Sequence, residues 1–200
     1  DKVHWNKSRL RQTTAGIPIQ KLTCTNRLLY RRGNFIGTCD QILCNALREE
    51  YEAYVAMSAG VRWGTTTLKG DWITMEDVMT QCSLTYGETY VTEMTGHDLL
   101  NILEQVADNL FDPDPYLQSG GDMVRVGGMD YTIDPSKPLY ERISDARLDN
   151  GHLIEADKKY KIAGWAQVNN TPEGRLMWDV VHDHIVKNKG EDNVLKIAKI

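Results

Sequence analysis

Segments with helical periodicity alternate along this chain with short strand-like segments, and this interleaving limits the folds open to it. Apolar residues recur at helical spacing in 38–51, 95–111 and 175–188, and a shorter helix is predicted from Thr74. Strands are predicted between them at 53–57, 89–94, 123–126, 129–133, 143–148, 152–154 and 159–168. This order predicts an α+β domain in which helices pack on a mixed sheet.

The ends of these elements carry their own signals. Thr95 suits the N-cap of the clearest helix, and the Asp-Pro-Asp-Pro run after Phe111 cannot continue it. Thr38 is predicted to cap the helix over 38–51, with Asp40 in its first turn. The Asp-Asn-Gly sequence at 149–151 predicts a hairpin, because Asn-Gly accepts a positive φ.

The length and composition suit one ordinary domain. The chain has 200 residues, of which 41% are hydrophobic. Residues 1–22 are polar and aperiodic, so we predict a linker or frayed arm there. The folded domain is expected over 23–188, with a C-terminal tail at 189–200. Because the chain opens with Asp1, we expect it to be a piece of a longer protein.

Charge and apolar content exclude several classes of partner. The net charge of −5 argues against a general nucleic-acid binder, which needs a concentrated basic face. No apolar stretch approaches the ~18 residues of a membrane span, so no membrane association is expected. The cysteines show neither metal-ligand spacing nor a C-x-x-C motif, and we expect free, mostly buried thiols at Cys24, Cys39, Cys44 and Cys82.

The loop at 58–64 is the strongest candidate for a binding site. Arg62 and Trp63 stand there between Gly60 and Gly64, directly after a predicted buried strand. A guanidinium group at a strand end, where glycines let backbone approach a ligand, suits an oxyanion such as phosphate or sulfate. The alternative is a surface arginine that stacks on the tryptophan.

A second basic pair lies upstream of the helix that leads to this loop. Arg31 and Arg32 are expected at the same edge of the sheet as Arg62, because the helix over 38–51 returns the chain to that edge. Two or three arginines there would hold a divalent oxyanion. The alternative is that Arg31 and Arg32 are solvated surface charges.

Aromatic residues beside the loops are candidates for the walls of a substrate slot. Tyr86, Tyr90 and Trp165 all flank predicted strands, although burial in the core is the commoner fate of such residues. His182 and His184 would lie about 200° apart on a helix, so they cannot share a metal ion. No nucleophile elbow, P-loop or dinucleotide fingerprint is present. By its own residues the chain is predicted to bind an anion without catalysing a reaction alone.

Several blocks of the sequence, in order, resemble one known family. Together they are similar to the C-terminal domain of the sulfur-oxidation thiosulfohydrolases, which belong to the 5′-nucleotidase family. The resemblance covers roughly 22–188. The blocks are 29–35 with 37–38, 60–64, 89–96, 106–111, 120–128, and 164–166 with 168–169.

The resemblance implies the substrate-binding half of a two-domain hydrolase. In that family an N-terminal metallophosphoesterase-type domain holds two metal ions, which are manganese in the thiosulfohydrolases, and they generate the attacking hydroxide. The ligand motifs of that domain are absent from this sequence, so the chain alone is expected to bind no metal and to be inactive. The partners implied are this N-terminal domain and a sulfur-carrier protein bearing a cysteine S-thiosulfonate. The implied location is the periplasm.

The resemblance also assigns residues to the site. Arg62, with Trp63 beside it, matches the arginine that grips the anionic group, and Arg31 or Arg32 matches an upstream basic position. Tyr86 stands where nucleotidases carry a phenylalanine that stacks on the base. Trp165 and Asn169 fall in a second substrate loop, and these assignments are carried by the resemblance alone.

Three functions remain open on the sequence. The first is the removal of sulfate from a carrier-bound thiosulfonate. The second is hydrolysis of a nucleotide or nucleotide-sugar by a member of the same superfamily. The third is a non-catalytic anion-binding or interaction domain.

Overall fold

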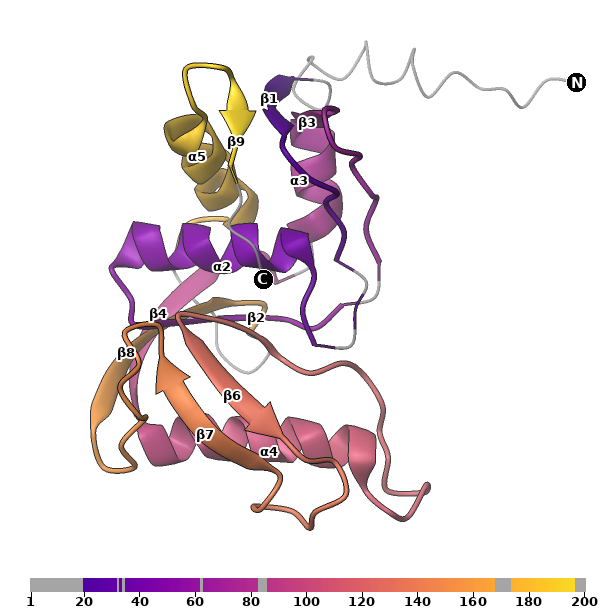
Figure 1. The fold of residues 1–200 in the computed structure, drawn as a ribbon, viewed down its shortest axis with the longest axis vertical. Helices are drawn as coiled ribbons and strands as arrows, with labels where there is room; N and C mark the ends of the chain where they lie inside the picture. Colours follow the sequence, from indigo (N-terminus) through magenta and orange to yellow (C-terminus); the bar gives the residue numbers. More distant parts are fainter. Residues whose placement is uncertain are drawn as a thin grey trace, which may run out of the picture.

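The computed structural model describes residues 20–31, 33, 35–61, 63–82, 86–167 and 174–196. Four helices and nine strands are assigned in these ranges (Figure 1). They are β1 (Lys21–Thr25), α2 (Thr38–Tyr51), β2 (Val55–Ser58), β3 (Trp72–Thr74), α3 (Met75–Cys82), β4 (Thr89–Thr95), α4 (Gly96–Phe111), β5 (Arg125–Gly127), β6 (Met129–Ile133), β7 (Ile143–Leu148), β8 (Lys159–Trp165), α5 (Met177–Asn188) and β9 (Val194–Leu195).

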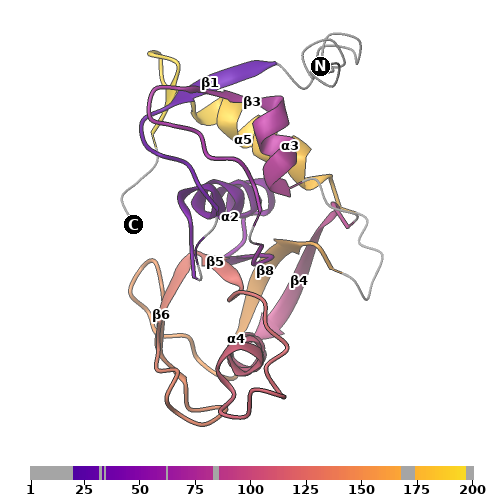
Figure 2. The same cartoon turned by 90° about the vertical axis from the view of Figure 1, so that its right-hand side faces the viewer.

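A four-stranded sheet forms the middle of the molecule. Its strand order is β4-β8-β2-β5, in which β2 and β8 are parallel and the other two pairs are antiparallel. Figures 1 and 2 show α2 on one side of this sheet and α4 on the other. The predicted α+β class with a mixed sheet is confirmed.

The central strands serve two hydrophobic cores. Val55 and Met57 of β2 pack in the core around α4, whereas Ala56 between them packs in the core around α2. In β8, Ile162 packs in the core around α4 and Ala163 packs in the core around α2. This division follows from the two-residue period of a strand, which sends successive side chains to opposite faces.

The layer on the α2 side also holds α3, α5 and a small sheet with the order β3-β1-β9 (Figure 1). Two predicted boundaries are wrong here. Lys21 and Leu22 belong to β1 and not to an arm, and the region 189–200 is not simply a tail. Leu195 lies in β9, which pairs in parallel with β1, and its side chain is buried in the core.

The layer on the other face consists of α4 and the β6–β7 pair. Leu99 and Leu103 of α4 are fully buried. Thr95 caps the helix as predicted: its Oγ1 accepts a hydrogen bond from the backbone N of Asp98 at 3.1 Å. The helix ends at Phe111, before the prolines.

Two local predictions need correction. Gly37, not Thr38, is the N-cap of α2, because the Thr38 hydroxyl donates to the carbonyl of Leu28 at 2.8 Å instead. The hairpin at 149–151 turns as expected, with Gly151 at a φ of 83°, but the residues after it form only one bridge, from Leu153 to Arg147. The main partner of β7 is β6.

Two further features concern the described residues as a set. Cys39, Cys44 and Cys82 are buried thiols and Cys24 is half-buried, in agreement with the prediction. Among the helices of these residues, none has the length and apolar character to cross a membrane.

Candidate anion-binding site

The glycine loop, defined as residues 58–64, begins at the last residue of β2, and its two glycines lie close to neighbouring segments. A Cβ on Gly60 would lie 2.5 Å from the carbonyl oxygen of Met123. Gly64 has a φ of 122°, and its Cβ would lie 2.5 Å from the side-chain oxygen of Gln81. Both glycines therefore allow the backbone to approach other parts of the domain. Arg62, the predicted anion ligand, lies outside the described residues.

Arg31 lies under the glycine loop and is only 1% exposed. Its Nη2 donates to the carbonyl oxygen of Ala59 at 2.7 Å and to Ser58 Oγ at 3.2 Å, and its Nη1 donates to the carbonyl oxygen of Gln81. The interpretation of Arg31 as a solvated surface charge is wrong. Its donors bind protein groups, so the structure gives Arg31 a supporting role beneath the loop. Arg32, the other candidate, lies outside the described residues.

Trp165 supports the same loop from β8. Its side chain is 3% exposed, and its Nε1 donates to Ser58 Oγ at 2.8 Å. The guanidinium carbon of Arg31 lies 5.4 Å from the centre of the Trp165 ring, which is within the range of a cation–π interaction. In this structure Trp165 is a core residue and does not form an open wall of a slot. Asn169 lies outside the described residues.

Two of the predicted aromatic residues do reach the surface. The side chain of Trp63 is 50% exposed and that of Tyr86 is 44% exposed. Tyr90 is half-buried, and this burial raises the pKa of its hydroxyl. Trp63 and Tyr86 are therefore available to contact a ligand or another domain, and their binding roles stay predictions.

A buried carboxylate, that of Asp40, lies beside Arg31 and is not evident as part of the site from the sequence. Asp40 Oδ1 lies 2.9 Å from Arg31 Nε, and its Oδ2 lies 3.2 Å from Arg125 Nε. Burial raises the pKa of Asp40, while the two guanidinium groups oppose this rise. One signal was available: Arg125 is the single charged residue in the predicted strand at 123–126. Its partner could not be read from the sequence.

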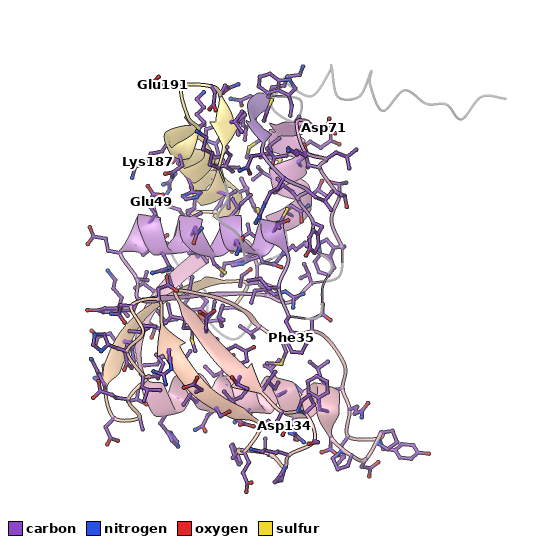
Figure 3. All side chains as sticks on the ribbon, in the orientation of Figure 1. Phe35, Glu49, Asp71, Asp134, Lys187 and Glu191 are labelled. Atoms are coloured by element: carbon purple, nitrogen blue, oxygen red, sulfur yellow. The ribbon has the colours of Figure 1, made fainter. Side chains whose placement is uncertain are left out.

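Potential metal ligands are dispersed among the residues described. None of their His, Cys, Asp and Glu side chains gather in groups of three or more that would hold an ion. His184 Nδ1 instead lies 2.5 Å from Glu49 Oε2, and Lys187 pairs with the same carboxylate. Figure 3 shows Lys187 on α5 beside Glu49 on α2. These residues do not fit a dimanganese centre, because Glu49 is already bound by His184 and Lys187.

A family model described as the C-terminal domain of 5′-nucleotidase matches residues 24–175. The chain belongs to this family. Among solved structures, the sulfate thiohydrolase SoxB of Thermus thermophilus in complex with glycerol is similar, with 27% sequence identity and a TM-score of 0.86. The match covers 96% of this chain and 36% of that one. The resemblance drawn from the sequence blocks is thereby confirmed.

More distantly related solved structures share the fold. A 5′-nucleotidase precursor from Thermus thermophilus has 15% identity and a TM-score of 0.73 over 96% of this chain and 41% of its own. The NAD nucleotidase of Haemophilus influenzae has 13% identity and a TM-score of 0.68 over 96% of this chain and 39% of its own. No curated protein matches the chain by sequence. This chain thus spans about two fifths of the length of these solved structures.

Proposed function

We propose that this domain is the substrate-binding half of a thiosulfohydrolase, which releases sulfate from a cysteine S-thiosulfonate on a carrier protein. The observation that carries the proposal is the likeness to SoxB, which exceeds the likeness to the nucleotidases in both identity and TM-score. Two manganese ions in a separate N-terminal domain would supply the hydroxide. The proposed location of the whole protein is the periplasm.

The glycine loop supports an anion-binding role. Arg31 donates to its backbone at Ala59 and Trp165 donates to its Ser58 side chain, while Gln81 holds Thr65 directly after it. Trp63, next to Arg62, is half-exposed. A fixed backbone lowers the entropy cost of holding a side chain against a charged group. Arg62 would neutralise charge on the sulfonate group, where charge shifts most in the transition state.

The second candidate is a nucleotide or nucleotide-sugar phosphohydrolase. The family description and the two nucleotidase structures favour it. The exposed ring of Tyr86 would then stack on a base. The third candidate, a non-catalytic anion-binding or interaction domain, would apply if the longer protein lacked metal-ligand motifs.

The first two candidates differ in the substrate of the longer protein. The test compares the release of sulfate from a thiosulfonate-loaded carrier with the release of phosphate from AMP. We expect turnover of the carrier, with AMP turnover lower by at least about two orders of magnitude in kcat/KM, as expected for a site built around a different leaving group. Turnover of AMP without turnover of the carrier would contradict the proposal.

Replacement of Arg62 tests the role of the glycine loop. In the longer protein, Arg62→Ala should lower kcat/KM by about 10²-fold or more, because a charged donor to the reacting group is lost. The matched control is Arg147→Ala, which removes an exposed arginine of β7 and should leave activity unchanged. Metal content should stay the same in both variants, and its loss in Arg62→Ala would contradict the assigned role.

A further inference from the structure

We infer that Asp40, through Arg31 and Arg125, is a positioning residue that holds the two arginine-bearing segments of the domain in register. The segments are the glycine loop, which contains Arg62, and 31–33, which contains Arg32. The inference rests on the proposed function in one respect, which is that these segments hold the anionic group of a substrate. Asp40 itself acts from inside the domain and does not touch the substrate.

The first arm of this arrangement runs from Asp40 to the glycine loop. Asp40 orients the Arg31 guanidinium through Nε at 2.9 Å. The Nη2 of Arg31 then fixes the start of the loop at the carbonyl oxygen of Ala59, at 2.7 Å. Gln81 holds the residue that follows the loop, because its Nε2 donates to the carbonyl oxygen of Thr65 at 2.8 Å. The backbone is therefore fixed on both sides of Arg62.

The second arm runs from Asp40 to the segment around Arg32. Asp40 Oδ2 accepts a hydrogen bond from the backbone N of Gly37 at 2.7 Å and faces Arg125 Nε at 3.2 Å. Arg125 in turn donates through Nη2 to the carbonyl oxygen of Gly33. Arg32 stands between Arg31 and Gly33, and both neighbours are held by this arrangement.

Arg125 also connects the two segments from the side of β5. Its Nη1 donates to the carbonyl oxygen of Met123 at 3.0 Å, and its Nη2 lies 3.0 Å from Asp122 Oδ2. Gly60 of the glycine loop packs on the same two residues, since a Cβ there would meet both of them. The segment that Arg125 fixes is therefore the one against which the glycine loop rests.

The complete burial of these three charged groups indicates that they position the backbone and do not only stabilise the fold. The side chains of Arg31, Asp40 and Arg125 are fully shielded from solvent. Taking such groups out of water is costly, and apolar residues of similar volume often stabilise a core equally well. What apolar residues cannot do is fix backbone carbonyls at hydrogen-bond distance. Because the Asp40 carboxylate contacts both guanidinium groups, it fixes the positions of the glycine loop and of 31–33 together.

The test uses Asp40→Asn in the longer two-domain protein, assayed where the variant is fully folded. Displacement of a binding group by about 1 Å costs on the order of 10²-fold in rate. We therefore expect kcat/KM to fall at least about tenfold and the inhibition constant of inorganic sulfate to rise by a similar factor. Metal content should not change.

The matched control is Asp108→Asn. Asp108 of α4 also pairs with a buried arginine, Arg142, at 2.6 Å, but in the layer on the far side of the central sheet. This variant should lower the thermal midpoint while kcat/KM and the sulfate inhibition constant stay within about twofold of wild type. If Asp40→Asn also lost only thermal stability, or if Asp108→Asn lost the same activity, the inference would be wrong.

A milder variant decides the case if Asp40→Asn does not fold. Ser58→Ala removes one acceptor shared by Arg31 and Trp165 and leaves every charge in place. It should raise the sulfate inhibition constant about threefold or more, since a lost hydrogen bond to a charged group loosens the loop. A wild-type constant in folded Ser58→Ala would overturn the inference.

The choice of substrate keeps this test separate from the proposed function. The assay uses whichever of carrier-bound thiosulfonate and AMP the longer protein hydrolyses. If it hydrolyses neither, the proposed function fails, and calorimetric binding of inorganic sulfate and inorganic phosphate provides the readout. Equal anion affinity in wild type and Asp40→Asn would then contradict the positioning role.

Discussion

Arg31 and Arg32 are neighbours with the same side chain, and the sequence offers no means to separate their roles. The structure places Arg31 in the core, whereas the sequence leaves open whether one of the two faces the substrate or both are solvated surface charges. Arg32 lies outside the described residues. The partners that hold Arg31 come from positions 40, 58, 59 and 81, so its role depends on the fold. Arg62 remains a prediction from its loop and its family.

At Gly64 the backbone and a neighbouring side chain both favour glycine. We expect Gly64→Ala to lower the free energy of unfolding by about 2 kcal/mol, since the positive φ costs about 1 kcal/mol and the Gln81–Thr65 hydrogen bond is lost as well. Gly70→Ala is the matched control. Gly70 has a φ of 91° and no neighbouring atoms within 4 Å of a Cβ, so only the backbone term applies. Equal losses in urea denaturation would show that the Gln81 contact is unimportant.

The carboxylate of Glu49 provides a pH test. A hydrogen bond from Lys187 is the main cause that lowers the pKa of Glu49 from 4.5 to about 2. Because the folded-state pKa is depressed, the stabilisation is present above about pH 4.5 and is lost as the pH falls toward 2. It is small, since the Lys187 side chain that makes the pair is exposed to solvent. Carbon NMR should find the low pKa in wild type.

A charge-matched pair of variants checks that assignment. Lys187→Gln should raise the pKa of Glu49 toward its ordinary value, because the main donor is lost. Lys189→Gln removes the same charge two residues away, beyond the end of α5, and should leave the titration unchanged. A wild-type titration of Glu49 near pH 4.5 would contradict the ion pair.

Helices were easier to predict than strands in this chain. The helix at 38–51 was predicted with the bounds that α2 has, because its periodicity extends over several turns. The strands β1, β3 and β9 were missed. They have five, three and two residues, too few for a clear alternation, and they exist because they pair with one another. The strand predicted after the turn at 149–151 does not form. The turn signal there is strong, but β7 pairs with β6 instead.

The capping of α4 is testable at the level of this element. Thr95→Ala should lower the free energy of unfolding by about 1 kcal/mol, because the helix loses the acceptor for the backbone N of Asp98. Thr95→Ser keeps the hydroxyl group and should lose at most a few tenths of this value. Chemical denaturation measures both, and an equal loss in the two variants would assign the effect to the methyl group of threonine.

The whole molecule depends on a central sheet that is shared by two cores. Its strands place neighbouring residues in different layers, as Val55 and Ala56 do. Neither layer has a complete core without these strands, so we expect the two layers to unfold in one cooperative transition. This sharing was not predictable from the sequence. The residues of β2 are apolar on both faces, which indicates a buried strand but does not identify the helix that covers each face.

The last strand tests how far the folded domain extends. Leu195→Ala should lower the free energy of unfolding by about 2–4 kcal/mol, because it leaves a cavity in the core on the α2 side. Leu153→Ala removes the same atoms from a half-exposed side chain and should cost less than about 0.5 kcal/mol. Equal urea midpoints for Leu195→Ala and wild type would show that β9 contributes nothing to the fold.

The pairing of β1 with β9 also bears on how the protein is made. Thr23 donates a hydrogen bond to Asn193, 170 residues further along the chain. A ribosome releases residues in order, so β1 emerges about 170 residues before its partner. Throughout that interval one edge of β1 has no strand to bind, and an unpaired edge attracts other chains. Chaperones that cover extended segments would therefore be needed most during synthesis, and much less once Leu195 has emerged.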